Sequence, residues 1–218
     1  MIVSQKVKLT FQSPEIQYLC RQDKHLAKVI HMIGPIEYEI QQNGYGFLVG
    51  EIMGQMVSNK VAAIFVQRLK AKCDQSITPE RIETLSDKEL RDIGISNSKV
   101  SYIRNVTKAF NDGEILATNF ENKTDQEILA TLTSVKGIGN WSAKMYLIFV
   151  LNRPNVLPYE DLAFLQGYGW MWNTDDYRKQ SVSKRCKKWS PYASIAARYM
   201  YQALDRGYTK EKFHLFKK

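Results

Sequence analysis

Helix-start signals recur along the chain and constrain its fold more than any other feature. Two are capping boxes, Ser86-Asp-Lys-Glu89 and Thr124-Asp-Gln-Glu127, and two more place a proline at the first helical position, in Ser13-Pro14-Glu15 and Thr78-Pro79-Glu80. The connectors between these signals are short. Only VKLTF at 7–11 alternates apolar and polar residues as a strand does. The pattern predicts an all-α protein, with one candidate β element near the N-terminus.

Further helices follow from capping residues and from the spacing of apolar side chains. Asp23 precedes HLAKVIHMI, and residues 45–56 are apolar almost throughout, as in a buried central helix. Ser58 and Ser96 each precede a segment with helical periodicity. Apolar residues after Ser58 fall at 3.6-residue spacing and predict an amphipathic helix, namely Val61, Ala62, Ile64, Phe65 and Leu69. Helices are also expected at 141–151 and, after an irregular part at 154–158, up to about residue 206.

The charge of the chain points to a polyanionic partner. A formal charge of +9 and a pI near 9.3 fit nucleic acid and, less often, an anionic membrane surface, although a solvated basic surface has the same composition. Cys20, Cys73 and Cys186 are too few and too far apart for a disulfide framework or a four-cysteine metal site. Neither a membrane span nor a signal peptide is visible. We therefore expect a soluble intracellular protein.

Residues 134–144, SVKGIGNWSAK, predict a helix–hairpin–helix. One helix ends near Thr133, the hairpin is Val135–Gly139, and the second helix begins at Asn140. Glycines can adopt positive φ and leave no Cβ in the way of a phosphate, while the N–H groups at a helix start form an anion site. Such contacts bind phosphates regardless of base sequence. A Gly-x-Gly turn is also a common helix C-cap, so this segment alone leaves both interpretations open.

An acidic pair follows the hairpin and completes a larger motif. LPYEDLAF places Glu160 and Asp161 shortly after a proline. Together with the hairpin, this segment resembles the helix–hairpin–helix DNA glycosylase superfamily, whose motif is L-x-x-[VIL]-x-G-[IV]-G, then a helix, then P-x-x-D. The motif corresponds here to Leu132 to Gly139 and Pro158 to Asp161. The run Gly-Ile-Gly-Asn-Trp-Ser-Ala is most similar to the 3-methyladenine DNA glycosylase II branch.

The resemblance covers about residues 23–206. Three further segments match the family pattern: GQMVSNKVAAIFVQRL, DKELRDIGISNSKVSYIRNV and KKWSPYASIAARYMYQ. Two features depart from it. Ala193 stands where arginine is usual, and GYGWMWN at 167–173 has no family counterpart, so its aromatic residues either line a cleft or pack inside, namely Tyr168, Trp170 and Trp172.

The resemblance implies an all-α, two-lobed glycosylase fold with a cleft between the lobes. One lobe would be the central helical bundle at 44–153, and the other would join 1–43 to 154–218. The implied partner is duplex DNA that contains a damaged base. The expected state is a monomer without membrane contact. The expected location is on DNA in a prokaryotic cytoplasm or in a eukaryotic nucleus.

The implied reaction is hydrolysis of the N-glycosidic bond of alkylated purines of the 3-methyladenine type, as in base excision repair. The base is flipped out of the duplex, and an abasic site remains in an intact strand. Two alternatives stay open: a glycosylase for a deaminated or oxidised base, and a non-catalytic helix–hairpin–helix DNA-binding protein in which Asp161 is only a helix cap. A basic protein at anionic membranes is a third, weakly supported by the C-terminal KEKFHLFKK.

The same resemblance assigns roles in the site. Asp161 would be the catalytic carboxylate, with Glu160 as the competing candidate, because a fixed anion stabilises an oxocarbenium-like sugar. Trp141 stands where bifunctional relatives carry a lysine, and an indole cannot form a Schiff base, so the enzyme would be monofunctional. Trp141, Tyr201 and Met145 would line the base pocket, whose aromatic rings suit a cationic alkylated purine.

Other implied positions concern DNA and ions. Met56, preceded by Gln55, would fill the gap left by the flipped nucleotide, although a methionine after an apolar run is often a core residue. The expected contacts to the DNA backbone are Lys136, Gly137, Gly139, Asn140, Ser142 and Lys144. Main-chain carbonyls of Thr133, Val135 and Ile138 fall where family hairpins hold Na⁺ or K⁺. No catalytic cofactor and no iron–sulfur cluster are expected.

Overall fold

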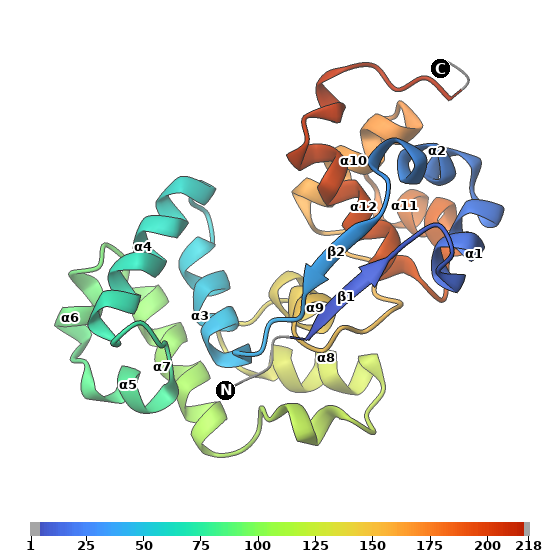
Figure 1. The fold of residues 1–218 in the computed structure, drawn as a ribbon. Helices are drawn as coiled ribbons and strands as arrows, with labels where there is room; N and C mark the ends of the chain where they lie inside the picture. The colour runs from blue at the N-terminus through green and yellow to red at the C-terminus, as the bar shows by residue number, and fades with distance from the viewer. Residues whose placement is uncertain (1–4, 216–218) are drawn as a thin grey trace. The chain divides into compact units, whose positions relative to one another are not determined.

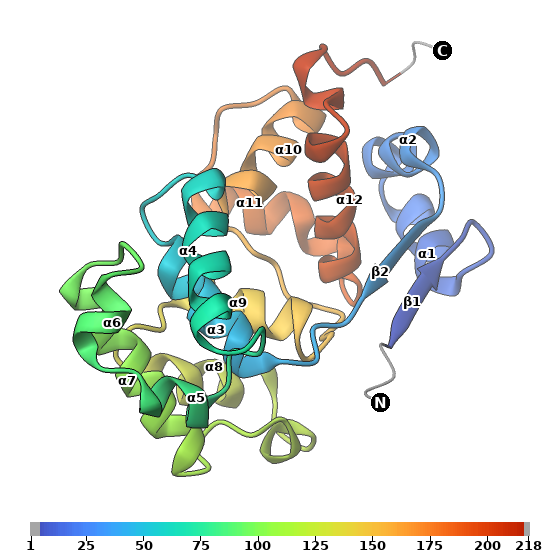
Figure 2. The ribbon, with the colours of Figure 1, turned by 60° about the vertical axis from the view of Figure 1, so that its left-hand side comes forward.

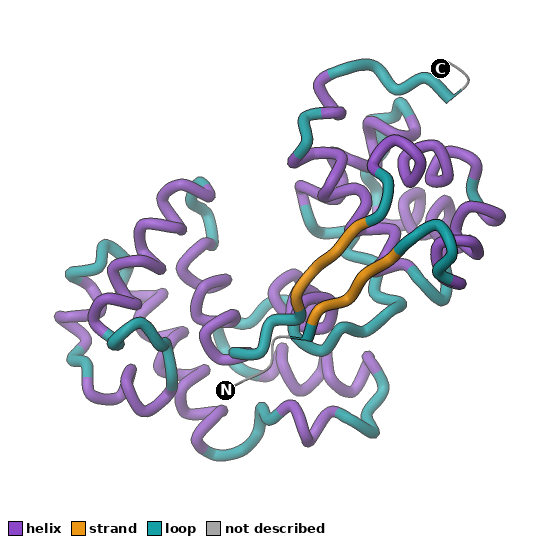
Figure 3. Tube along the Cα trace, in the orientation of Figure 1, coloured by secondary structure: helices purple, strands orange, loops and turns teal. Residues whose placement is uncertain are grey.

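The computed structural model describes residues 5–215, which form two compact units. The described residues of Met1–Ile40 and Asn152–Lys218 make up one, called here the carboxylate unit because it contains Asp161. Gln41–Leu151 make up the other, called the hairpin unit. Twelve α-helices and one pair of short strands lie within residues 5–215 (Figure 3), which confirms the predicted helical fold class.

The carboxylate unit begins with a two-stranded antiparallel sheet (Figure 1). Strand β1 (Lys6–Leu9) pairs with β2 (Ile36–Glu39), with Leu9 opposite Ile36. β1 starts one residue before the expected 7–11 segment and ends at Leu9, while β2 was not predicted from its four residues IEYE. A strand this short is specified by its partner more than by its own sequence, and the partner here lies about thirty residues away.

Two helices connect these strands, α1 (Pro14–Gln22) and α2 (Lys24–Ile33). Asp23 caps α2 as predicted, because its Oδ1 accepts the N–H groups of His25 and Leu26 at 2.9 and 3.4 Å. Its Oδ2 accepts the indole N–H of Trp189 at 2.8 Å, inside the core. Ser13 precedes α1, but its side chain caps nothing; its Oγ accepts the N–H of Thr10 at 2.9 Å instead.

The second half of this unit contains α10 (Leu162–Trp172), α11 (Lys179–Cys186) and α12 (Ala193–Asp205), with 3₁₀ turns η2 (Lys187–Trp189) and η3 (Tyr208–Lys210). Helices α10 and α12 lie side by side (Figure 2) and also pack on α2. Their approach requires Gly167, since a Cβ there would lie 2.8 Å from the Cβ of Met200. This pair of helices positions Asp161, which directly precedes α10.

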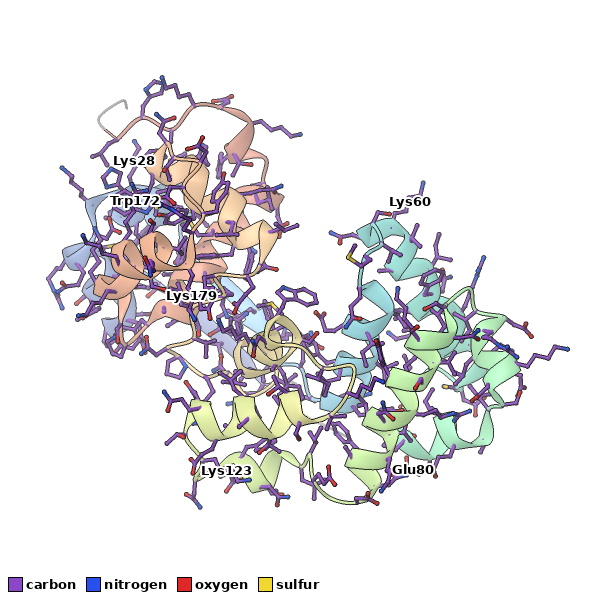
Figure 4. All side chains as sticks on the ribbon, turned by 180° about the vertical axis from the view of Figure 1, so that it is seen from behind. Lys28, Lys60, Glu80, Lys123, Trp172 and Lys179 are labelled. Carbon is purple, nitrogen blue, oxygen red and sulfur yellow. The ribbon has the colours of Figure 1, made fainter. Side chains whose placement is uncertain are left out.

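The aromatic segment 167–173 forms the last turns of α10 and packs within the carboxylate unit. Tyr168 is fully buried in the core. The Trp170 indole donates a hydrogen bond to the Glu211 carbonyl at 2.8 Å. Trp172, labelled in Figure 4, packs on His25 with ring centroids 4.2 Å apart. The aromatic residues of segment 167–173 therefore pack inside this unit and against the chain after α12.

The hairpin unit is built around α3 (Gly44–Gly54), which packs on α4 (Asn59–Lys72), α7 (Asn97–Asn111) and α9 (Asn140–Phe149). Two short helices, α5 (Pro79–Thr84) and α6 (Asp87–Arg91), lie against α7, and η1 (Ala117–Phe120) leads into α8 (Asp125–Ser134). The predicted helix caps are confirmed, because a side chain accepts a backbone N–H at each of Ser58, Thr78, Ser86, Ser96 and Thr124.

Helix α4 differs from the expected amphipathic helix. Of its apolar residues only Leu69 is buried, whereas Val61 and Ile64 are each 37% exposed. The helix packs mainly on α3 through small side chains, with Ala62 facing Gly54. Apolar spacing predicted the helix correctly, but the number of neighbouring elements decides how much of its surface is covered.

Candidate functional site

The hairpin has the predicted boundaries: α8 ends at Ser134 and α9 begins at Asn140. Gly137 adopts a φ of +116°, and a Cβ at this position would lie 2.5 Å from the Cβ of Tyr102 on α7. Gly139 has a φ of −90°, so it does not use the positive φ that the sequence allowed. No atom lies within 4 Å of the position of a Gly139 Cβ. The first glycine therefore fits the hairpin to α7, and the second leaves open space.

Two side-chain amides hold the main-chain carbonyls at the tip of the hairpin. Asn105 Nδ2 donates to the Lys136 carbonyl at 3.0 Å, and Gln55 Nε2 donates to the Gly137 carbonyl at 3.1 Å. The carbonyls expected to hold a monovalent cation, those of Thr133, Val135 and Ile138, are different ones. Val135 O also accepts the N–H of Ile138 at 3.0 Å. The sequence did not indicate either amide contact.

Helix α9 starts without a side-chain cap, because its N-cap residue is Gly139. The N–H of Ala143 bonds to the Gly139 carbonyl at 3.0 Å and begins the helical hydrogen-bond series. Helix geometry leaves the N–H groups of the first turn without acceptors inside the helix, at the positive end of the helix dipole. Lys136 and Asn140 are exposed beside this turn. This helix start therefore has no side-chain cap, and two polar residues are exposed beside it.

Two of the expected backbone-binding residues, Ser142 and Lys144, are buried. The exposed fractions are 2% for Ser142 and 8% for Lys144. From Ser142 to Ile148 every residue of α9 is buried, so this helix is covered on all sides rather than on one face. Only a small part of each of these two residues is exposed.

Trp141 and Met145 lie one helical turn apart on α9 and so share a face of the helix. Trp141 is partly exposed, and Met145 is buried. The structure thus brings two of the three expected base-pocket residues together. Tyr201, the third, lies on α12 in the carboxylate unit and is partly buried.

Met56 occupies the turn between α3 and α4 and is not a core residue. It is 101% exposed and has a φ of +59°, a conformation that a residue with a side chain adopts at a cost in free energy. Lys99 Nζ donates to the Met53 carbonyl at 2.9 Å, just before the turn, and burial lowers the pKa of this lysine. The turn presents a flexible apolar side chain on a backbone fixed by its neighbours.

Asp161 is the N-cap residue of α10. Its Oδ1 accepts the N–H of Phe164 at 2.7 Å, its own N–H donates to the Pro158 carbonyl at 3.0 Å, and it is 8% exposed. The carboxylate is therefore fixed in direction and largely removed from water. Glu160, the competing candidate, is partly exposed. Leu162, on the other side of Asp161, is 75% exposed.

Lys179 lies beside the segment that carries Asp161 and was missed from the sequence. It comes from the first turn of α11 (Figure 4), and its Nζ lies 4.8 Å from the centroid of the Tyr159 ring. A hydrogen bond with Tyr159 raises the pKa of Lys179. No motif marks this lysine, since the chain makes a full helix and a loop between positions 159 and 179.

The helix that carries Tyr201, α12, also carries a buried arginine. Arg198, three residues earlier, is 7% exposed, and its guanidinium carbon lies 3.7 Å from the centroid of the Tyr38 ring on β2. Burial lowers the pKa of Arg198, and the nearby Tyr38 counteracts this. The contact joins α12 to the strand pair. Arginine is thus present on this helix, though not at the position of Ala193 where the family pattern has it.

Two features are absent from residues 5–215, a metal-ligand cluster and a membrane-spanning helix. Within residues 5–215, no three side chains of the histidine, cysteine, aspartate and glutamate types are grouped to hold a metal ion. No helix in the same described range is long and apolar enough to cross a membrane.

Curated proteins and a family model are similar to this chain. Residues 49–191 match the model of the HhH-GPD superfamily of base excision DNA repair proteins. DNA-3-methyladenine glycosylase 1 of Schizosaccharomyces pombe is 28% identical over 183 residues, which cover 82% of this chain and 80% of that protein. The DNA-3-methyladenine glycosylase of Saccharomyces cerevisiae is 32% identical over 132 residues, which cover 56% of this chain and 44% of that protein.

Solved structures agree with these matches. The DNA-3-methyladenine glycosidase of Bacillus halodurans superposes with a TM-score of 0.84 at 28% identity, over 96% of this chain and 97% of that one. The 3-methyladenine DNA glycosylase of Schizosaccharomyces pombe, solved in complex with abasic DNA, has the same fold, with a TM-score of 0.81 at 24% identity over 94% and 100% of the two chains. The hairpin, the helical fold and the match over residues 49–191 show that this chain belongs to the HhH-GPD superfamily of base excision DNA repair proteins.

Proposed function

We propose that the protein is a monofunctional DNA glycosylase that hydrolyses the N-glycosidic bond of alkylated purines in duplex DNA, with 3-methyladenine as the typical substrate. Membership of a base excision repair family supports glycosylase activity, and the names of the most similar proteins support the alkylated purine. The observation that carries the proposal is a fixed, buried carboxylate, Asp161, at the P-x-x-D position of that family.

Asp161 would act on the sugar of the flipped nucleotide. The bond between C1′ and the base nitrogen breaks with its electron pair going to the base, and positive charge develops on the sugar. A fixed anion stabilises that charge more strongly in a site that excludes water than in solvent. A water oxygen then bonds to C1′, and the carboxylate accepts the proton that this water loses. The hydrogen bond from Phe164 N–H to Asp161 Oδ1 would keep the carboxylate oriented during these steps.

The base would be recognised by aromatic and apolar side chains. Trp141 and Met145 share a face of α9, and Tyr201 on α12 is the third residue proposed for a base contact. A methylated adenine carries positive charge, which an indole or phenol ring attracts. Because Trp141 carries no amine, the sugar would not be attacked covalently at this position, and no strand cleavage through a Schiff base is expected.

The hairpin would hold the DNA backbone. Exposed Lys136 and Asn140 and the open main chain at Gly139 support this role more directly than the buried Ser142 and Lys144 do. The hairpin carbonyls are oxygen donors of the kind that bind Na⁺ or K⁺. Thr133, Val135 and Ile138 would supply them, since these are the positions that the family resemblance implies. A bound cation would add positive charge beside the phosphate.

A non-catalytic DNA-binding protein is the second candidate, and one observation favours it: Asp161 does cap α10. The substitution Asp161→Asn separates the two functions, because asparagine is as good an N-cap as aspartate but carries no charge. We expect release of alkylated purine to fall about 10²–10³-fold, the loss typical of one preorganised electrostatic contact, while DNA binding persists. Unchanged base release with intact binding would show that Asp161 is only a cap.

The substrate is tested separately with duplexes that each carry one defined lesion. Free base and strand breaks are scored independently for alkylated, deaminated and oxidised bases. We expect release of alkylated purines without strand breaks. Preferential release of another base would contradict the proposed substrate, and a borohydride-trapped enzyme–DNA adduct would contradict the monofunctional mechanism.

A further inference from the structure

We propose that Gln55 is a positioning residue that ties the Met56 turn to the hairpin, so that the hairpin's grip on the DNA backbone fixes the direction in which Met56 enters the duplex. This inference rests on the proposed function, in which Met56 fills the gap left by the flipped nucleotide. It gives Gln55 a different role from the one implied by resemblance, which grouped it with the inserting residue. Gln55 would act through the protein and not through DNA.

The contact that carries the proposal joins two distant parts of the chain. Gln55 Nε2 donates to the Gly137 carbonyl at 3.1 Å, across 82 positions of sequence. The Gln55 side chain is partly buried, while the next residue, Met56, is 101% exposed. An amide that points at the hairpin while its neighbour points into solvent separates two tasks. One residue holds the turn, and the other is presented.

The backbone has a positive φ at Gly137, which accepts this hydrogen bond, and at Met56, the residue after Gln55. Met56 has a φ of +59° and Gly137 a φ of +116°. Gly137 is held against Tyr102, where a Cβ would come within 2.5 Å of that side chain. A residue held in the left-handed region persists there only when its surroundings determine it, and such residues concentrate at functional sites. The Gly137 carbonyl is therefore a rigid acceptor, and the Gln55 hydrogen bond transfers that rigidity to the turn.

A second donor fixes the turn from another side, which makes the role of Gln55 separable. Lys99 Nζ donates to the Met53 carbonyl at 2.9 Å and lies 5.9 Å from the centroid of the Phe65 ring. This contact joins the end of α3 to α7 and α4 and leaves the hairpin out. The hydrogen bond of Gln55 thus joins the Met56 turn to the hairpin, and the Lys99 contact does not. Loss of the Gln55 hydrogen bond should leave the turn folded but free of the hairpin.

An insertion side chain gains from being held in advance. Flipping a nucleotide requires unstacking, and a side chain already ordered in the free protein loses less freedom when it enters the gap. The contribution of one neutral hydrogen bond corresponds to about a three- to tenfold change in an equilibrium or rate. The effect should appear only where flipping is difficult. A lesion that is already unstacked needs no such help.

The test uses isosteric variants and a matched control. Gln55→Glu keeps the shape but replaces the amide donor by an acceptor-only carboxylate, and Gln55→Met removes the donor without adding charge. Asn105→Asp is the control, since it removes the hairpin's other amide donor, the one at 3.0 Å to the Lys136 carbonyl, which has no link to Met56. Each variant is given 7-methylguanine in a fully paired duplex and in a bulge where the base is unstacked.

For every combination of variant and substrate, we measure single-turnover base release at saturating enzyme and the Kd for DNA. For Gln55→Glu and Gln55→Met we expect release from the paired duplex to slow about three- to tenfold, with Kd unchanged and normal release from the bulge. Met56→Ala should show the same dependence on pairing. Asn105→Asp should weaken Kd on both substrates without changing the ratio of their rates.

Two results would overturn the proposal. Equal slowing on the paired and bulged substrates would mean that Gln55 supports the fold in general, and no slowing on either would mean that the contact is idle. Failure of the proposed function looks different. In that case the unsubstituted protein releases no base from any duplex of the lesion panel, and the role of Gln55 falls with it.

Discussion

Two helix N-termini, one in each unit, are built in opposite ways. Helix α9 in the hairpin unit is preceded by Gly139, which has no side chain to accept its first N–H groups. Helix α10 in the carboxylate unit is preceded by Asp161, whose Oδ1 accepts the N–H of Phe164 at 2.7 Å. The first helix start is left open, and the second is closed by a negative side chain.

This difference corresponds to the two tasks of a base excision enzyme. Binding a DNA backbone requires N–H donors that a phosphate can reach, and an uncapped helix start supplies them together with the positive end of a dipole. The chemical step requires one negative charge at one place. Capping a helix start places such a charge where the dipole favours it and fixes its direction. Under the proposed function, the same structural position would bind an anion in one unit and hold one in the other.

The largest effect is expected from Gly137→Ala. The new Cβ would lie 2.5 Å from the Tyr102 Cβ at a φ of +116°, so hairpin and α7 must separate. Overpacking together with backbone strain should lower the free energy of unfolding by about 2–4 kcal/mol and should weaken DNA binding. Chemical denaturation and fluorescence anisotropy measure the two quantities. Unchanged stability would mean that Tyr102 can move aside, and that the hairpin is not built on this close approach.

Asp161→Ala and Asp161→Asn should differ in stability but not in activity. Alanine removes both the charge and the cap of α10, which should cost about 1 kcal/mol of unfolding free energy, whereas asparagine keeps the cap. Base release should fall about 10²–10³-fold in both. Thermal and chemical unfolding of the pair measure the cap, and single-turnover assays measure the charge. If the two variants were equally stable, the hydrogen bond from Phe164 N–H to Asp161 would contribute nothing to the stability of α10.

Local interactions explain why much of the fold was predictable. The caps at Ser58, Ser86, Ser96 and Thr124 each involve a bond to a residue three positions ahead, so the sequence window that contains them is sufficient. The hairpin is also specified by a short stretch of sequence. The exception is Gly137, which is required by its close approach to Tyr102 on α7. Strand β2 was missed because its partner lies far away in sequence, and the burial of Ser142 and Lys144 because neighbouring helices, not the helix itself, cover them.

The sequence indicated which residues are candidates for the site, but it did not indicate their contacts or their burial. Motif spacing singled out Asp161 as the candidate carboxylate, whereas its hydrogen bond to Phe164 N–H and its low exposure are seen only in the structure. Sequence left Met56 divided between core and surface, and the structure places it fully in solvent. Gln55 and Lys179 make their contacts across 82 and 20 positions, and no periodicity or motif encodes either pairing.

The third effect in size concerns the salt dependence of DNA affinity, which a substitution in the hairpin should change and one at Asp161 should not. Each neutralised phosphate contributes about 0.9 to the slope of log K against log salt concentration. Lys136→Gln should therefore reduce the slope by about this amount, because Lys136 is exposed on the hairpin. Asp161→Asn should leave the slope unchanged. Lys123→Gln, on the same unit but before α8, is the control; an equal reduction there would indicate diffuse attraction by net charge instead of binding at the hairpin.

The smallest change in stability, and the sharpest test of the comparison, is expected from Gly139→Ser. The site has a φ of −90° and open space, so serine fits without strain, and its hydroxyl can cap α9 as Asp161 caps α10. Since serine is a slightly better N-cap than glycine, stability should rise by a few tenths of a kcal/mol. DNA affinity should nevertheless fall, because the hydroxyl would take an N–H that a phosphate uses. If stability and DNA affinity both rose, DNA would not bind at this helix start, because capping the start of α9 would then not weaken binding.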